Sequence, residues 1–477
     1  MAFASTEPTA SVTSRELPPD FVLGAATSSY QIEGAVYAGG RGEAIWDRFA
    51  TVPGATADAA SGMDACDHYH RMDEDLDLLA ELGADVYGFS IAWPRIQPDG
   101  VGKGKPDGLA FYDRLVDGLL ERGIEPYVTL YHWDLPQTLE DRYDGWRGRD
   151  TAGRFADYAT IMGNALGDRV TRWATVHDPA SVAWSGYERG THAPGVRDAG
   201  GSIRAAHHLL TGHGMATQAL VAAGATGVGI TLRLADARPA SDASGDIAAA
   251  ELADAMQNRF WLGALAHDVP DDVVELFSNV VNLEELSRPG DDVLASQPLD
   301  WLGVDYDGPT LVRAGQRRSG ANAEADAAAA AARRPAGPGL DGIEVVGPGP
   351  GDPGTMHGSR IDANGLATVL AQATVALPDT PIVVTGSGTS APDVLDARGA
   401  VEDWHRIAYL TDHLAATLTA RADGVPVAGY LTRSLLDGFE WADGYGPRRG
   451  LVHVDHETQR RTTKASYRWM QQLLRGR

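Results

Sequence analysis

Short hydrophobic runs recur along this chain and alternate with longer stretches in which apolar residues return every three or four positions. The runs are rich in Val, Ile, Leu and aromatic residues, a composition typical of buried β-strands. Helical periodicity is clear in DEDLDLLAELG (73–83) and GLAFYDRLVDGLLERG (108–123). We expect strands at residues 21–26, 86–91, 125–131, 172–176, 227–232, 300–306, 381–385 and 427–436. Strands alternating with helices predict a parallel α/β fold, either a closed barrel or a doubly wound open sheet.

One segment, residues 314–357, breaks this alternation. It contains AEADAAAAAARRPAGPG and VGPGPGDPG, which are rich in Ala, Pro and Gly. Such a composition predicts a long loop between the sixth and seventh strands, either a disordered insertion or a lid over a site on the C-terminal face of a barrel. We expect residues 1–16 to form a flexible tail and residues 17–477 to form one domain.

Composition and charge narrow the classes of partner. The 477 residues are 43% hydrophobic and suit one large barrel domain, while the net charge of -25 argues against nucleic acid and anionic membranes as partners. Cys66 is the only cysteine, which excludes a disulfide framework. The N-terminal segment lacks the basic and apolar regions of a signal peptide, and no window approaches a membrane span, so we expect a cytoplasmic protein without a membrane partner.

Seven motifs follow one another in a fixed order. They are LPPDFVLGAATSSYQIEGA (17–35), FSIAWPRIQP (89–98), VTLYHWDLPQ (128–137), GYERGTHAPG (186–195), HHLLTGHGMA (207–216), LLDGFEWADGY (435–445) and GLVHVDHETQRRTTKASYRW (450–469). Together they resemble family 1 glycoside hydrolases, the β-glucosidase and β-galactosidase family. The resemblance runs from about residue 17 to the C-terminus and is weakest over 235–360. It implies a single (β/α)8 TIM barrel with its site on the C-terminal face.

The resemblance also implies a group of residues that holds the non-reducing sugar. The positions that match this group are Gln31, His132, Glu440 and Trp441, and all four keep the family's residue type. Carboxylate and amide groups suit vicinal hydroxyls, while the imidazole and indole add oriented hydrogen-bond donors. Trp133, beside His132, joins these substrate-binding candidates.

The two catalytic motifs of the family are altered in this chain. Retaining members use a glutamate acid/base in Thr-x-Asn-Glu-Pro and a glutamate nucleophile in Thr-Glu-Asn-Gly. Here the motifs read TVHDP (175–179) and TGSG (385–388), so Asp178 stands in the acid/base position and Gly386 in the nucleophile position. Because glycine cannot form a glycosyl ester, the resemblance predicts a divergent member that has lost the nucleophile and its covalent glycosyl-enzyme.

Further replacements gather around the same part of the predicted pocket. The resemblance implies that the family residues beside the reacting carbon are replaced at Gly88, His177, Asp305, Asp307, Ser359, Arg433 and Arg449. Since the residues that hold the far side of the sugar are retained, this pattern predicts a rebuilt pocket.

Three of the polar residues are candidates for catalytic roles. Asp178 is the first candidate acid or base, and His177 is a candidate base, proton shuttle or hydrogen-bond donor because of its residue type. Asp307 is a candidate to activate a water above Gly386, as in an inverting hydrolase. A metal site formed by these three side chains has no recognised ligand spacing, so we expect neither a metal nor a cofactor.

Arg433 has two alternative roles. It could form an internal ion pair with Asp305 or Asp307, or it could act with Arg449 to bind a carboxylate or phosphate of the ligand. An ion pair that lies away from the cavity would refute the second role.

The sequence therefore predicts an enzyme that acts on a sugar or sugar-containing metabolite, with or without a negative charge. We expect a mechanism without a covalent glycosyl-enzyme: inverting hydrolysis, glycosyl transfer, or an acid/base rearrangement or elimination. Two alternatives are a catalytically inactive protein that binds a sugar or a partner protein, and residual β-glucosidase activity through another carboxylate such as Asp393 or Asp396.

Overall fold

The centre of the molecule is a closed barrel of eight parallel strands. In this computed structural model, which describes residues 12–315 and 343–476, the ring order is β1-β11-β10-β7-β5-β4-β3-β2. The barrel strands are β1 (Val22–Ala26), β2 (Val86–Ser90), β3 (Glu125–Tyr131), β4 (Arg172–His177), β5 (Val228–Arg233), β7 (Trp301–Tyr306), β10 (Ile382–Ser387) and β11 (Val427–Arg433). Each of the eight hydrophobic runs forms one of these strands. The first strand, β1, pairs with both β2 and the last strand, β11, which closes the ring and confirms the barrel over the open sheet.

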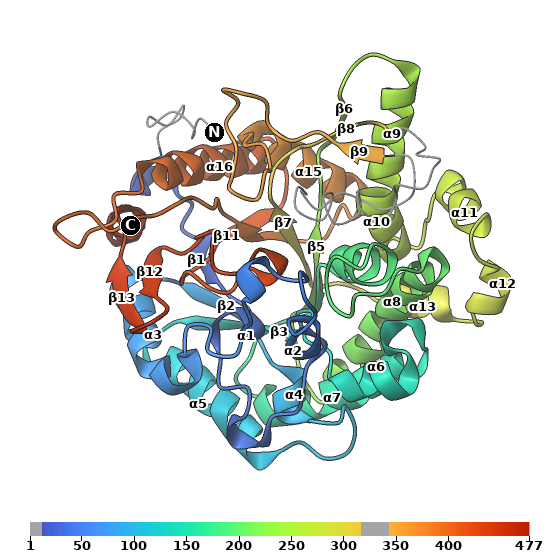
Figure 1. The fold of residues 1–477 in the computed structure, drawn as a ribbon, viewed down its shortest axis with the longest axis horizontal. Coiled ribbons are helices and arrows are strands. Elements are labelled where there is room, and N and C mark those ends of the chain that lie inside the picture. Colours follow the sequence, from blue (N-terminus) through green and yellow to red (C-terminus); the bar gives the residue numbers. More distant parts are fainter. Residues whose placement is uncertain (1–11, 316–342, 477) are drawn as a thin grey trace.

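Helices surround the barrel, as Figure 1 shows. The longer ones are α3 (His68–Leu82), α5 (Pro106–Glu121), α7 (Asp150–Leu166), α8 (Ala199–Ala222), α15 (Ala363–Ala376), α16 (Trp404–Ala422) and α17 (Ala465–Arg475). In α3, the side chains of Met72, Leu76 and Leu79 lie on one buried face at helical spacing. The helix ends at Gly83, whose φ of 79° is a left-handed conformation that favours glycine.

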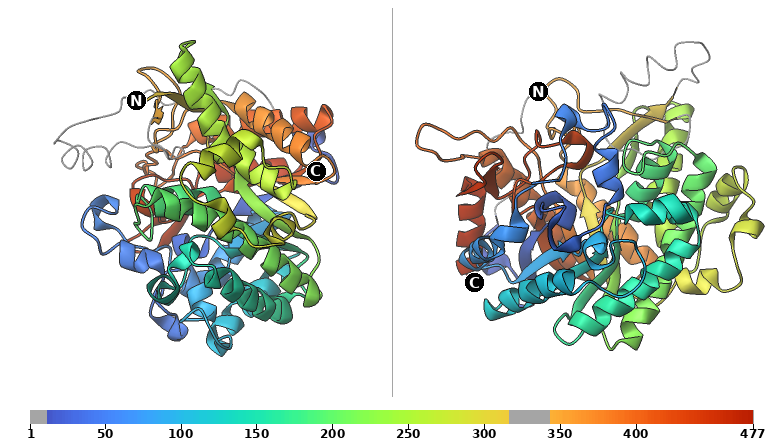
Figure 2. Two further views of the ribbon diagram at one scale, coloured as in Figure 1. Left: turned by 90° about the vertical axis from the view of Figure 1, so that its right-hand side faces the viewer. Right: turned by 60° about the horizontal axis from the view of Figure 1, so that its bottom comes forward.

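Shorter elements decorate the loops of the barrel. The short α-helices are α1 (Ser29–Ile32), α2 (Ile45–Phe49), α4 (Trp93–Ile96), α6 (Gln137–Tyr143), α9 (Ser244–Asp254), α10 (Phe260–Leu265), α11 (Asp271–Ser278), α12 (Leu283–Leu286) and α13 (Asp291–Ala295). Outside the barrel, one sheet contains β6 (Ala237–Pro239), β8 (Thr310–Ala314) and β9 (Ile343–Val345), and a hairpin contains β12 (Val452–Asp455) and β13 (Arg460–Thr463). The small sheet and α9 project from the rest of the molecule (Figure 2).

The predicted Ala/Pro/Gly-rich loop falls largely outside the described residues, because 316–342 are not among them. On its far side, the described chain resumes at β9 and reaches α15 through residues 346–362. Within the described ranges, the helices are too short or too polar to cross a lipid bilayer.

The C-terminal ends of the barrel strands bring the candidate residues together. His177 ends β4, Arg433 ends β11, and Gly386 lies one residue before the end of β10. Large side chains fill the interior on the other side of these ends, including those of Tyr127 and Trp301. The barrel is therefore a packed core that presents polar groups at one mouth.

Candidate active site

A cavity of about 740 Å³ opens at this mouth. Its lining includes Asp178, Arg233, Asp307, Arg433, Glu440 and Arg449. A second cavity, of about 40 Å³, lies inside the barrel and is lined by His132, His177 and Thr385 among others. The predicted site residues thus converge on one region from many separate strands and loops.

The sugar-binding candidates form one connected group. The Gln31 side-chain amide donates hydrogen bonds to Glu440 Oε1 at 3.2 Å and to the Phe439 carbonyl at 3.0 Å. The Trp441 ring lies 4.6 Å from that of Trp133 and 5.7 Å from that of His132, measured between centroids. The sequence-based grouping of these residues agrees with their positions, and their role in binding stays a prediction.

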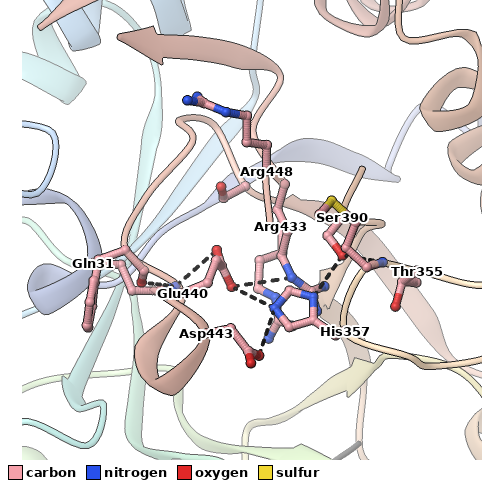
Figure 3. Close-up of polar contacts among 12 residues, drawn as sticks. Gln31, Thr355, His357, Ser390, Arg433, Glu440, Asp443 and Arg448 are labelled. Atoms are coloured by element: carbon pink, nitrogen blue, oxygen red, sulfur yellow. Dashed lines mark hydrogen bonds and ion pairs between the residues drawn. The ribbon is translucent and has the colours of Figure 1, made fainter. Parts of the chain in front are cut away.

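Glu440 lies at the centre of polar contacts from several loops (Figure 3). Its Oε2 atom lies 3.4 Å from Nε of Arg449 and 3.8 Å from Nε2 of His357. Burial raises the pKa of Glu440, although the charges of Arg449 and Arg433 work in the opposite direction. Because Glu440 lines the large cavity, its carboxyl group is within reach of a ligand there.

His357 lines the cavity but was not identified from the sequence, because it is the last residue of the Ala/Pro/Gly-rich segment 314–357 and belongs to no motif. Its Nδ1 lies 2.8 Å from Oγ of Ser390, and its Nε2 lies 3.5 Å from Asp443. Burial, together with the nearby charge of Arg449, lowers the pKa of His357 well below its ordinary value. The imidazole is therefore neutral near pH 7 and adds a polar wall without adding charge.

Asp178 follows β4 and is buried with a left-handed backbone φ of 45°. The Ser181 amide donates to its Oδ1 at 3.0 Å, and its Oδ2 lies 3.4 Å from Nε of Arg233. Arg233, at the end of β5, is a second residue that sequence reasoning missed. Because both oxygens have local partners, Asp178 is held in a defined position in the lining of the large cavity, and its role as an acid or base stays a prediction.

His177 and Asp305 form a close ion contact between β4 and β7. Nε2 of His177 lies 2.8 Å from Oδ2 of Asp305, and Thr385 donates a hydrogen bond to Oδ1 at 2.7 Å. The His177 ring also stacks on His132 with a centroid separation of 3.8 Å. Burial acts to raise the pKa of Asp305, but the charges of His177 and Arg433 and these contacts lower it overall.

Gly386 lies directly beside that carboxylate. Strands β10 and β7 pair with Gly386 opposite Asp305. A Cβ atom added at Gly386 would lie 2.6–2.7 Å from the carboxyl atoms of Asp305, closer than real Cβ contacts occur. The space that a side chain at Gly386 would enter is therefore filled by Asp305.

Asp307 is surrounded by guanidinium groups. Its nearest cations are Arg433 at 2.7 Å, Arg233 at 3.2 Å and Arg449 at 3.3 Å. Burial acts to raise the pKa of Asp307, but these three cations hold it far below its ordinary value. Its role as a general base stays a prediction, although so acidic a carboxyl group favours charge balance over proton abstraction.

The two alternatives for Arg433 are partly resolved by these distances. Arg433 pairs with Asp307 and lies 3.7 Å from Asp305, so the expected ion pair is present. However, Arg433 and Asp307 both line the large cavity. The ion pair lies at the cavity and not away from it, so binding of an anionic ligand group by Arg433 and Arg449 is not refuted.

Two other carboxylates, Asp393 and Asp396, are far less suited to attack a substrate. Asp393 is enclosed by Lys464 at 2.5 Å and Arg406 at 2.7 Å. Asp396 accepts hydrogen bonds from its own loop, including the Ala400 amide at 3.0 Å. Across the described residues, no group of His, Cys, Asp and Glu side chains is arranged to hold a metal ion.

Comparisons with known proteins identify the family. The model of glycosyl hydrolase family 1 matches residues 13–477. Beta-glucosidase A of Acetivibrio thermocellus is 39% identical over 96% of this chain and 98% of its own length, and thermostable beta-glucosidase B of Thermobispora bispora is 43% identical over 96% and 90%. A solved family 1 β-glucosidase from Thermotoga maritima has a TM-score of 0.86 at 35% identity, covering 96% of this chain and 98% of that one.

These comparisons overturn the prediction of a mechanism without a covalent glycosyl-enzyme. Relatives that share 39–43% identity over nearly the whole chain are named β-glucosidases, which supports the family's retaining mechanism over inverting hydrolysis, glycosyl transfer or rearrangement. The prediction was wrong because it gave one missing side chain, at Gly386, more weight than similarity along the whole barrel. The chain belongs to glycosyl hydrolase family 1 and is a glycosidase-type enzyme whose small-molecule partner is a sugar or glycoside.

Proposed function

We propose that the protein hydrolyses β-glucosides. The observation that carries this proposal is the assembled group of Gln31, Glu440 and Trp441 at the barrel mouth of a family 1 chain. A buried carboxylate with an adjacent amide and indole provides hydrogen bonds and a stacking surface for one sugar ring. The names of the relatives support the glucoside as the substrate class.

We propose Asp178 as the acid/base of this reaction. It follows β4 in the family's position and lines the cavity. It is one methylene shorter than glutamate, so we expect slower turnover than a glutamate would give, because displacements of about 1 Å can cost about 100-fold. The proposal also holds that the chain is divergent, with Gly386 in the nucleophile position and His177 as a positioning residue.

A negative charge on the substrate is a further part of the proposal. Arg449 is buried, and its Nε donates no well-aligned hydrogen bond although Glu440 lies 3.4 Å away. The neighbouring Arg433 shares its carboxylate, Asp307, with Arg449. An acidic group on the ligand would give these donors a second acceptor.

Hydrolysis of 4-nitrophenyl β-D-glucoside by the full chain tests the proposed function. We expect release of 4-nitrophenol from the β-anomer and none from the α-anomer. Asp178→Asn is expected to lower kcat by about 100-fold or more, since general acid catalysis contributes about 10²–10⁴. Binding of deoxynojirimycin, a ligand of the Thermotoga maritima relative, would show that the protein is folded with an intact pocket. If such a protein releases no nitrophenol between about pH 5 and 8, hydrolysis is refuted.

A further inference from the structure

Asp305 combines three features of an attacking carboxylate. First, it lies beside the strand position from which the family's nucleophile would project, since its carboxyl atoms lie 2.6–2.7 Å from the Cβ that Gly386 lacks. A carboxylate from β7 therefore reaches the space next to the end of β10. The glycine is a steric requirement of this arrangement, because a side chain there would displace Asp305.

Second, the carboxylate keeps a free lone pair while it is held in place. Oδ1 accepts a hydrogen bond from Thr385 at 2.7 Å. Oδ2 lies 2.8 Å from Nε2 of His177 but accepts no well-aligned hydrogen bond among the described residues. Oδ2 also lies 3.7 Å from Nη1 of Arg433. The carboxylate is therefore held in place from both sides, and a fixed carboxylate is preorganised to act as a nucleophile.

Third, its neighbours reach the space where a sugar would lie. Thr385, His177 and Arg433 line the small cavity inside the barrel, and Gln31 and His132 of the sugar-binding group line the same cavity. Asp305 itself is only 1% exposed. Because Asp305 contacts His177, Thr385 and Arg433, it lies directly behind the lining of this cavity and close to the sugar-binding group.

We propose that Asp305 is the nucleophile of this enzyme, an inference that rests on the proposed β-glucosidase activity. An Asp305 oxygen forms a bond to the anomeric carbon while the bond from that carbon to the leaving oxygen breaks. The leaving oxygen takes the bonding electron pair and receives the proton of Asp178. Water then attacks the anomeric carbon and gives a proton to the Asp178 carboxylate, and the released Asp305 carboxylate completes the cycle.

Covalent trapping tests this assignment. The intact enzyme is incubated with 2,4-dinitrophenyl 2-deoxy-2-fluoro-β-D-glucoside, whose fluorine slows release of a glycosyl ester, and the labelled peptide is mapped by mass spectrometry. We expect the label on Asp305, and proton NMR of a normal substrate should show the β-anomer as the first product. Asp396→Asn is the matched control, because this carboxylate lies outside the cavity and should leave labelling unchanged.

A second variant keeps the proposal testable if trapping is slow. Asp305→Ala should lower kcat by about 10³-fold or more, in line with the loss of a covalent nucleophile, and azide should restore leaving-group release and give the α-glucosyl azide. A label on another carboxylate, or turnover that yields the α-anomer first, would overturn the role of Asp305 and leave β-glucoside hydrolysis intact. Absence of any turnover in the folded wild type would overturn the proposed function itself.

Discussion

Replacement of Asp307 by asparagine tests the charge balance of the cavity most directly. The change keeps the shape of the side chain but leaves the guanidinium groups of Arg233, Arg433 and Arg449 facing one another without their shared anion. Removal of one partner from a buried ion pair costs about 3–5 kcal/mol. The Asp307 side chain is 19% exposed, so solvent screens part of the repulsion. We therefore expect a loss near the lower end of that range, about 3 kcal/mol.

The pH dependence of this loss follows from the direction of the pKa shift of Asp307. The pKa of its carboxyl group is lower in the folded protein than in the unfolded chain, where it is about 3.9, because the three cations outweigh the effect of burial. A depressed folded pKa contributes stability that is fully present above the unfolded pKa and is lost as the pH falls below it. The stability gap between wild type and Asp307→Asn should be constant above about pH 5 and should shrink below about pH 4.

The difference in free energy of unfolding between wild type and Asp307→Asn is measured by urea denaturation at about pH 7 and pH 3.5, with tryptophan fluorescence as the signal. Asp396→Asn is the control, since its carboxylate is bonded within a surface loop and its removal should change stability by less than about 1 kcal/mol. Equal stability of Asp307→Asn and wild type at neutral pH would refute the charge-balancing role. A gap that stays the same at pH 3.5 would refute the assigned pKa shift.

Three further predictions concern the other side chains around the cavity. Gly386→Ala should lower kcat by about 10-fold or more, because its Cβ would displace the Asp305 carboxylate. The control Gly153→Ala should keep full activity, because a Cβ at this helical position meets nothing within 4 Å. Equal rates for the two variants would contradict the argument. Glu440→Gln should lower kcat/KM for aryl β-glucosides by about 10- to 100-fold, since charged hydrogen bonds contribute about 1.5–3 kcal/mol, and unchanged steady-state kinetics would remove Glu440 from the binding group. Arg449→Gln should lower the ratio of kcat/KM for a carboxyphenyl β-glucoside to that for a neutral phenyl β-glucoside by about 10-fold; an unchanged ratio would exclude an acidic ligand group at Arg449.

The fold could be predicted from the sequence because it depends on local patterns. Hydrophobic runs buried on both faces and separated by amphipathic helices specify parallel strands, and each run formed a barrel strand. The pattern left barrel and open sheet as alternatives, since closure depends on the pairing of the first barrel strand, β1, with the last, β11. The motifs then placed Gln31, His132 and Glu440 at one mouth, where the structure also has them.

The contacts that decide the chemistry could not be predicted in the same way. Arg233 and His357 belong to no motif, and their partners Asp178 and Glu440 come from other strands and loops. The sequence indicates Asp305 as a replaced residue near the reacting carbon and as a partner for Arg433, but not as a nucleophile, because its position beside the end of β10 depends on strand register. Register is a property of the assembled sheet, and sequence periodicity alone does not reveal which residues face each other across it.

The altered residues of the pocket also depend on one another, which limits what any one of them can imply about mechanism. Arg433 lies 2.7 Å from Asp307 and 3.7 Å from Asp305, and a buried guanidinium without these carboxylates would be strongly destabilising. Asp305 in turn leaves room only for a glycine at position 386. The absence of a side chain at Gly386 is therefore not in itself an argument against a covalent intermediate, because the neighbouring strand brings a carboxylate to the same place. The single substitution Gly386→Glu should fail to increase activity, since the new side chain would compete with Asp305 for one space and would add a negative charge beside it.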